Sequence, residues 1–66
     1  MRILLNGQGY DAPQGATVLA LLEQSGLPAG RVAVEVNGKV VRREEFSRLA
    51  LCDRDRVEVV HFVGGG

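Results

Sequence analysis

Two Asn-Gly pairs, Asn6-Gly7 and Asn37-Gly38, constrain the fold of this chain more than any other feature. Each pair follows an apolar stretch that has the composition of a β-strand, Arg2–Leu5 in the first case and Val32–Val36 in the second. Asn-Gly in that setting is the strongest short-range signal for a two-residue hairpin, because both central residues of the favoured turn need positive φ. The chain is therefore predicted to contain two antiparallel hairpins.

The turn length also predicts which side chains share a face of each hairpin. Directly opposed residues lie on the same side of an antiparallel ribbon, and a slip of one residue would move every side chain to the other side. The residues predicted to face a core are Ile3, Leu5, Tyr10, Val32, Val34, Val36 and Val41. The residues predicted to face away from it are Arg2, Leu4, Asp11, Glu35 and Val40.

A short helix is predicted between the two hairpins. Thr17 is a candidate N-cap, because its hydroxyl can accept a hydrogen bond from a free amide of the first turn. The apolar residues between Val18 and Leu22 fall at helical spacing, and Gly26 can end the helix in the left-handed conformation. Pro28 then prevents continuation. A helix this short is only marginally stable in isolation, and packing on a sheet is therefore expected to stabilise it.

The remainder of the chain predicts a turn and a last strand. Arg43–Leu49 is interpreted as a turn, or a single helical turn, that carries Phe46 and Leu49 inward, and residues 53–55 form a polar turn. In the last strand, Arg56 to Phe62, Val57 and Val59 lie on one face and Glu58, Val60 and Phe62 on the other. The predicted elements are one helix and about five strands, which indicates an α+β fold with a single sheet wrapped around that helix. Residues 1–62 are expected to form one domain, and residues 63–66 a flexible glycine tail.

Composition narrows the possible functions. The 66 residues carry eight basic and eight acidic side chains, and a neutral chain has no electrostatic reason to bind nucleic acid or an anionic membrane. A small all-β nucleic-acid binder is a rival class, against which the neutral charge and the three aromatic residues argue. With one cysteine and no apolar run long enough for a membrane span, a complete cytoplasmic chain is expected.

The sequence offers no catalytic constellation. His61 has no second metal ligand or nucleophile at a useful spacing, which favours a structural or surface role. Cys52 has no helix start and no histidine beside it that would activate its thiol, so a small core or edge residue is expected rather than a reactive thiol. Glu44 and Glu45 are adjacent on a surface turn and are expected to be solvated. We therefore expect neither enzymatic activity, nor a metal, nor a bound cofactor.

Two other features are candidate functional sites. The last strand leads directly into Gly64, Gly65 and Gly66, whose thin backbone ends in a free carboxylate. Terminal glycines are equally typical of a disordered linker, which is the structural alternative. The second feature is an outward-facing apolar group predicted to dock a partner, consisting of Leu4, Val40, Val60 and Phe62.

In length and motif order the chain resembles the ThiS family, the small sulfur carriers of thiamine thiazole biosynthesis, which have the ubiquitin-like β-grasp fold. The resemblance covers the whole chain, and its motifs end in a terminal Gly-Gly that Gly65 and Gly66 match, with Gly64 as one glycine more. The matching stretches are Met1–Gly7, Thr17–Leu22, Val34–Gly38, Leu51–Asp55 and Val59–Gly66.

The resemblance implies a chemistry for the tail. A ubiquitin-activating-like adenylyltransferase would use ATP to adenylate the carboxylate of Gly66, and a sulfur donor such as a cysteine desulfurase would convert it to a thiocarboxylate. The thiocarboxylate would then pass sulfur to thiazole synthase. Gly64 and Gly65 would thread the partner's active site, since residues 63–66 reach roughly 13–14 Å when extended. A carrier for molybdopterin or tRNA thiolation, and a ubiquitin-like interaction module that never uses its carboxylate, remain alternatives.

Overall fold

The first Asn-Gly pair turns the chain between β1 (Arg2–Leu5) and β2 (Gln8–Asp11) in the computed structural model, which describes residues 1–62. Asn6 and Gly7 have φ values of 50° and 81°, as this turn requires. β1 and β2 pair antiparallel, with Ile3 opposite Tyr10. The predicted register of the first hairpin is therefore confirmed.

The second Asn-Gly pair makes the same turn between β3 (Val32–Val36) and β4 (Lys39–Val41). Asn37 has a φ of 52° and Gly38 a φ of 83°. Val34 lies opposite Val41, which confirms the predicted register. Val34 and Val41 are buried, whereas Glu35 and Val40 point away from the core and are exposed.

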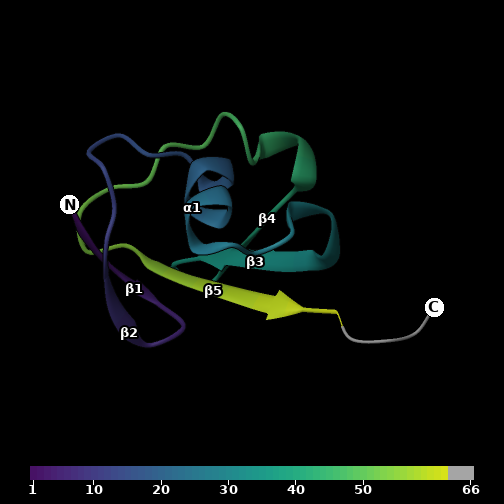
Figure 1. Cartoon of the computed structure of the whole chain (residues 1–66), viewed down its shortest axis with the longest axis horizontal. Coiled ribbons are helices and arrows are strands. Elements are labelled where there is room, and N and C mark those ends of the chain that lie inside the picture. The colour runs from purple at the N-terminus through teal and green to yellow at the C-terminus, as the bar shows by residue number, and fades with distance from the viewer. Residues whose placement is uncertain (63–66) are drawn as a thin grey trace.

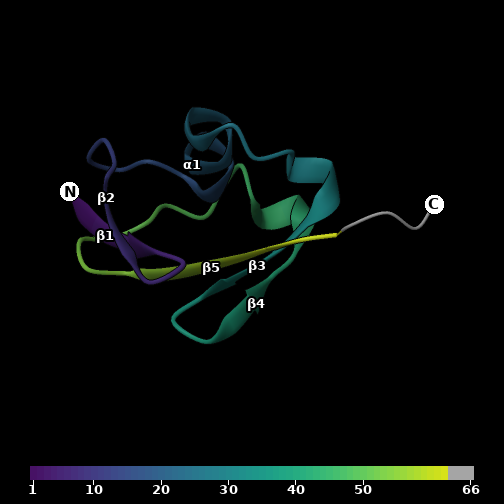
Figure 2. The same cartoon turned by 60° about the horizontal axis from the view of Figure 1, so that its bottom comes forward.

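The last strand, β5 (Arg56–His61), lies between the two hairpins. β5 runs parallel to β1 and antiparallel to β3, which gives a mixed five-stranded sheet in the order β2-β1-β5-β3-β4. Figures 1 and 2 show α1 (Val18–Ser25) lying across one face of this sheet. The opposite face carries no helix in the described part of the chain, and we call it the outer face.

The helix begins and ends as its sequence predicts. Thr17 Oγ1 accepts a hydrogen bond from the Ala20 amide at 3.1 Å, and Gly26 ends the helix with a φ of 77°. Leu21 and Leu22 are completely buried, so the helix is stabilised by packing on the sheet. Among residues 1–62, no helix is long and apolar enough to span a membrane.

Two short 3-10 turns complete the helical layer, η1 (Ala29–Arg31) and η2 (Arg43–Glu45). Phe46 is buried after η2, as predicted, but the prediction that Leu49 faces inward is wrong. The backbone of Leu49 faces the start of α1, since its carbonyl accepts from the Val18 amide at 3.0 Å, and its side chain is 38% exposed. Leu51 takes the core position instead.

The core forms between α1 and the inner face of the sheet. Every strand residue predicted to face inward is buried or packs against the buried cluster, with Leu5, Tyr10 and Val36 half-buried. The fully packed cluster contains Ile3, Val18, Leu21, Leu22, Val32, Val34, Val41, Phe46, Leu51, Val57 and Val59.

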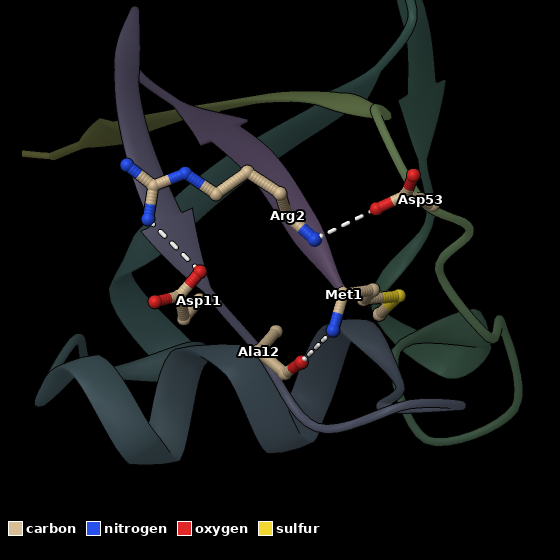
Figure 3. Close-up of polar contacts among 5 residues, drawn as sticks. All are labelled: Met1, Arg2, Asp11, Ala12 and Asp53. Atoms are coloured by element: carbon tan, nitrogen blue, oxygen red, sulfur yellow. Dashed lines mark hydrogen bonds and ion pairs between the residues drawn. The ribbon is translucent and has the colours of Figure 1, made fainter.

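Polar contacts tie the start of β1 to its neighbours (Figure 3). The Arg2 guanidinium lies over Gly9, where a β-carbon would collide with it, and reaches Asp11 at 2.9 Å. This hydrogen bond, together with the positive charge of Arg2, holds the pKa of the Asp11 carboxyl below its ordinary value. The Arg2 amide also donates to Asp53 Oδ1 at 2.8 Å, which fixes the polar turn before β5.

Candidate functional site

The four apolar residues predicted to form a docking patch all lie on or beside the outer face and are exposed to solvent. Their exposed fractions are 41% for Leu4, 73% for Val40, 61% for Val60 and 55% for Phe62. Isolated exposed apolar side chains are ordinary, but several on one sheet face are typical of a partner surface. The assignment of a docking role to them stays a prediction.

The register shows that these four residues do not form one continuous patch. Val60 lies near the end of β5 and Phe62 lies one residue beyond it, and both are exposed. Because they are two residues apart along an extended chain, they are neighbours on the same side. Val40 lies on the edge strand opposite Glu35, and Glu35 lies opposite Glu58. The Glu35 carboxylate therefore separates Val40 from β5, which is two strand spacings or about 9–10 Å away.

Leu4 belongs to a separate part of the outer face. It lies opposite Arg56, at the end of β5 remote from Phe62. A depression of about 340 Å³ opens there, over the contact between β1 and β5. The residues that line this depression are Leu4, Asn6, Gly7, Arg56, Val57 and Glu58.

Both hairpin turns hold β5 through asparagine side chains, which the sequence did not reveal. The Asn6 amide accepts from the Val59 amide at 2.8 Å and donates to the Val59 carbonyl at 3.3 Å. On the other side, Asn37 Oδ1 accepts from the Arg56 amide at 2.9 Å, and Asn37 Nδ2 donates to Asp55 at 3.0 Å. The strand that leads to the glycine tail is thus fixed from both flanks.

The last described hydrogen bond before the tail joins the Phe62 amide to the Arg31 carbonyl at 2.9 Å. Gly64, Gly65 and Gly66, predicted to carry the chemistry, lie outside the described residues. The predicted tail of residues 63–66 and the role of each glycine therefore stay predictions. In Figure 1 the end of β5 lies at the side of the molecule opposite Met1.

The remaining candidate residues lie apart from one another. His61 is exposed at the end of β5, in agreement with a surface position. Cys52 is exposed beside the polar turn, where its amide donates to Asp55 at 2.7 Å, so the alternative that it belongs to the core is wrong. Within residues 1–62, no three His, Cys, Asp or Glu side chains are grouped so that they could hold a metal ion.

Comparison with known proteins identifies the family. Residues 3–66 match the family model described as "ThiS family". The chain belongs to the ThiS family. A crystal structure described as thiamine biosynthesis protein (ThiS) from Geobacter metallireducens superimposes with a TM-score of 0.86 at 35% identity, over 100% of both chains. The ubiquitin-like β-grasp fold that the ThiS resemblance implied is thereby confirmed.

Two relatives differ in what their names describe. "Sulfur carrier protein ThiS" of Bacillus subtilis is 44% identical over 50 residues, which cover 76% of each chain. "Thiazole synthase" of Magnetococcus marinus is 44% identical over all 66 residues of this chain. The chain spans only 20% of that relative's length. A ThiS-like segment is thus joined to a much longer protein in that case.

Proposed function

We propose that this protein is a sulfur carrier of thiamine biosynthesis. The observation that carries the proposal is the ThiS match over residues 3–66, a range that includes the final glycines. The likeness to a ThiS crystal structure over the full length of both chains supports the same function. In this proposal the chain is a co-substrate rather than an enzyme, and its partners supply the catalytic groups.

The proposed reactive group is the α-carboxylate of Gly66. A carboxylate resists nucleophilic attack because neither oxygen is a good leaving group. An adenylyltransferase of the ubiquitin-activating type would attach AMP from ATP to one oxygen and release pyrophosphate. The outer sulfur of a persulfide on a donor such as a cysteine desulfurase would then attack the carbonyl carbon, and AMP would leave. A thiol would reduce the resulting acyl disulfide to the thiocarboxylate and become a disulfide itself.

The proposed acceptor of the sulfur is thiazole synthase. Support comes from the Magnetococcus marinus relative, which is named "Thiazole synthase" and contains a segment matching this entire chain. Two functions that occur in one polypeptide in one organism are commonly performed by interacting proteins in another. ATP is consumed by the activating enzyme in this scheme, and the carrier itself needs no resident cofactor.

The outer face is the proposed docking surface for the activating enzyme. Val60 and Phe62 are exposed on the strand that precedes the tail, so a partner that binds them would lie beside Gly64 and Gly65 as they enter its active site. Burial of such side chains would contribute roughly 25 cal/mol per Å² of apolar surface removed from water. Docking would thereby set the position of the tail before the chemistry begins.

Intact-mass analysis of the protein isolated from its native cells tests the function. A fraction of the protein heavier by the difference between sulfur and oxygen, with the added mass in the C-terminal peptide, is expected. This fraction should disappear when the activating enzyme gene is deleted. A protein that never carries this mass, in cells starved of thiamine so that the pathway is active, would contradict the proposal.

A further inference from the structure

The side chain of Arg43 holds the segment whose Arg31 carbonyl accepts a hydrogen bond from the Phe62 amide, just beyond β5. The Arg43 guanidinium, in η2, donates to three backbone carbonyls of the η1–β3 segment. Nε reaches the Ala29 carbonyl at 3.3 Å, and Nη2 reaches Gly30 at 3.1 Å and Val32 at 3.3 Å. The planar fork of arginine suits several acceptors at once, which the single ammonium of lysine cannot match.

The three carbonyls flank Arg31, which makes the contact that matters for the tail. The Arg31 carbonyl accepts from the Phe62 amide at 2.9 Å, one residue beyond β5. Val32 lies opposite His61 in the adjacent ladder position. The backbone that Arg43 holds is therefore the same backbone that fixes the end of β5.

The η1 part of this segment has little packing of its own. None of its residues is buried, although Ala29 packs against the core and the next residue, Val32, belongs to it. Within η1 the Arg31 amide donates to the Pro28 carbonyl at 2.9 Å, as a 3-10 turn requires. Charge-assisted hydrogen bonds are roughly twice as strong as neutral ones, so the Arg43 contacts contribute much of the local order. Loss of the fork would let the η1–β3 segment, and with it Phe62, move more widely.

We propose that Arg43 is a positioning residue for the reactive C-terminus. It fixes the backbone at Phe62, from which residues 63–66 continue to the carboxylate that a partner must adenylate. The proposal rests on the sulfur-carrier function. The proposed effect of Arg43 is on the position of the reacting carbon and not on its charge. A displacement of about 1 Å at a reacting atom can lower a rate by about a hundredfold.

Amide hydrogen exchange on the free protein tests the structural half without any partner. Arg43→Met and Arg43→Lys should both speed exchange of the Phe62 amide by roughly threefold to tenfold, the effect of weakening one hydrogen bond. The Asn6 amide, bound to the Val57 carbonyl at 2.9 Å, reports on the other end of β5 and should not change. Arg48→Met removes the same charge from an exposed position and is the matched control.

Steady-state ATP–pyrophosphate exchange with the cognate activating enzyme tests the functional half. Both Arg43 variants should lower kcat at least about tenfold, because the reacting carbon is misplaced. The KM for the carrier should rise by a smaller factor, because Phe62 is only one of the proposed docking residues. Arg48→Met should behave as wild type in both parameters. If wild type itself gave no exchange, the sulfur-carrier function would fail, and the hydrogen-exchange comparison would still decide whether Arg43 fixes Phe62.

Three results would overturn the proposal. The first is unchanged Phe62 exchange in Arg43→Met. The second is faster exchange at Phe62 and Asn6 alike, which would make Arg43 a general stabiliser of the fold. The third is an Arg43→Lys variant that matches wild type in kcat, because the positive charge and not the fork would then be what matters.

Discussion

Glu35 lies directly opposite Glu58 across the antiparallel pair of β3 and β5, in the middle of the outer face. Like charges in this position destabilise a sheet, by about 0.2–1 kcal/mol for a directly opposed pair. Glu35→Gln is therefore expected to raise the free energy of unfolding by an amount in that range. Urea titration measures this change, and the gain should shrink in high salt because both carboxylates are exposed. Glu44→Gln removes an exposed carboxylate from the η2 turn and should give no comparable gain.

Substitutions on the outer face can show whether a partner binds the β5 side, at Val60, or the edge strand, at Val40. Val60→Asp should weaken the complex with the activating enzyme by at least about tenfold, because the new carboxylate would lie unpaired in an apolar contact beside the tail. Val40→Asp should weaken the complex less, since Val40 lies on the edge strand beyond Glu35. Both sites are more than half exposed, so neither variant should unfold. If titration calorimetry found that Val60→Asp binds the activating enzyme as tightly as wild type, Val60 would not be part of the docking surface.

The hairpins and the helix could be predicted because their signals are local. Asn6-Gly7 dictates its own register, and Thr17 and Gly26 sit within reach of the backbone groups that they cap. Which side chains reach a distant strand could not be predicted. Asn6 and Val59 are 53 residues apart, and their contact exists only after β5 has entered the sheet.

Contacts between distant segments also explain why the burial of Leu49 was predicted wrongly and why the four apolar residues were predicted to form one patch. Leu49 and Leu51 are equally apolar, and only the pairing of residues 16–18 with residues 49–51 decides which is buried. The exposed positions of Val40 and Val60 followed from alternation along their strands. Their separation by Glu35 and Glu58 depends on the order of the strands, which alternation does not specify.

The contact between Asn6 and β5 can be tested without disturbing the turn. Asn6→Gly retains a residue that tolerates the φ of 50°, but loses both hydrogen bonds of the side-chain amide to Val59. Stability should fall by about 1–3 kcal/mol, since the Val59 amide also loses its partner. Thermal and urea unfolding measure the loss. A variant as stable as wild type would mean that water replaces the amide without penalty.

The ion pair between Arg2 and Asp11 predicts a dependence of stability on pH. Since the pKa of Asp11 is lowered in the folded protein, this group stabilises the fold at a pH above its unfolded value. The contribution is lost as pH falls through the lowered folded pKa. Asp11→Asn should therefore be slightly less stable than wild type at neutral pH, and the two should converge in acid. Both side chains are largely exposed, so added salt should also reduce the difference.

The functional proposal depends most on the position of the last carbon. Removal of Gly66 moves the carboxylate back by roughly 3.3–3.6 Å, and an added alanine moves it forward and places a methyl group beside it. Either change should abolish ATP–pyrophosphate exchange with the activating enzyme, because a misplacement of about 1 Å already lowers rates by about a hundredfold. This assay reports adenylation before any sulfur is involved.

Two controls separate this effect from a defect in folding. Among the described residues the last member of the core is Val59, so both tail variants should unfold at the same urea concentration as wild type. A carboxypeptidase that removes alanine but stops at glycine should restore exchange to the extended protein. If the extended protein supported exchange as fast as wild type before that treatment, the carboxylate of Gly66 would not be the adenylated group. The chain would then be better described as a β-grasp interaction module that acts through its outer face.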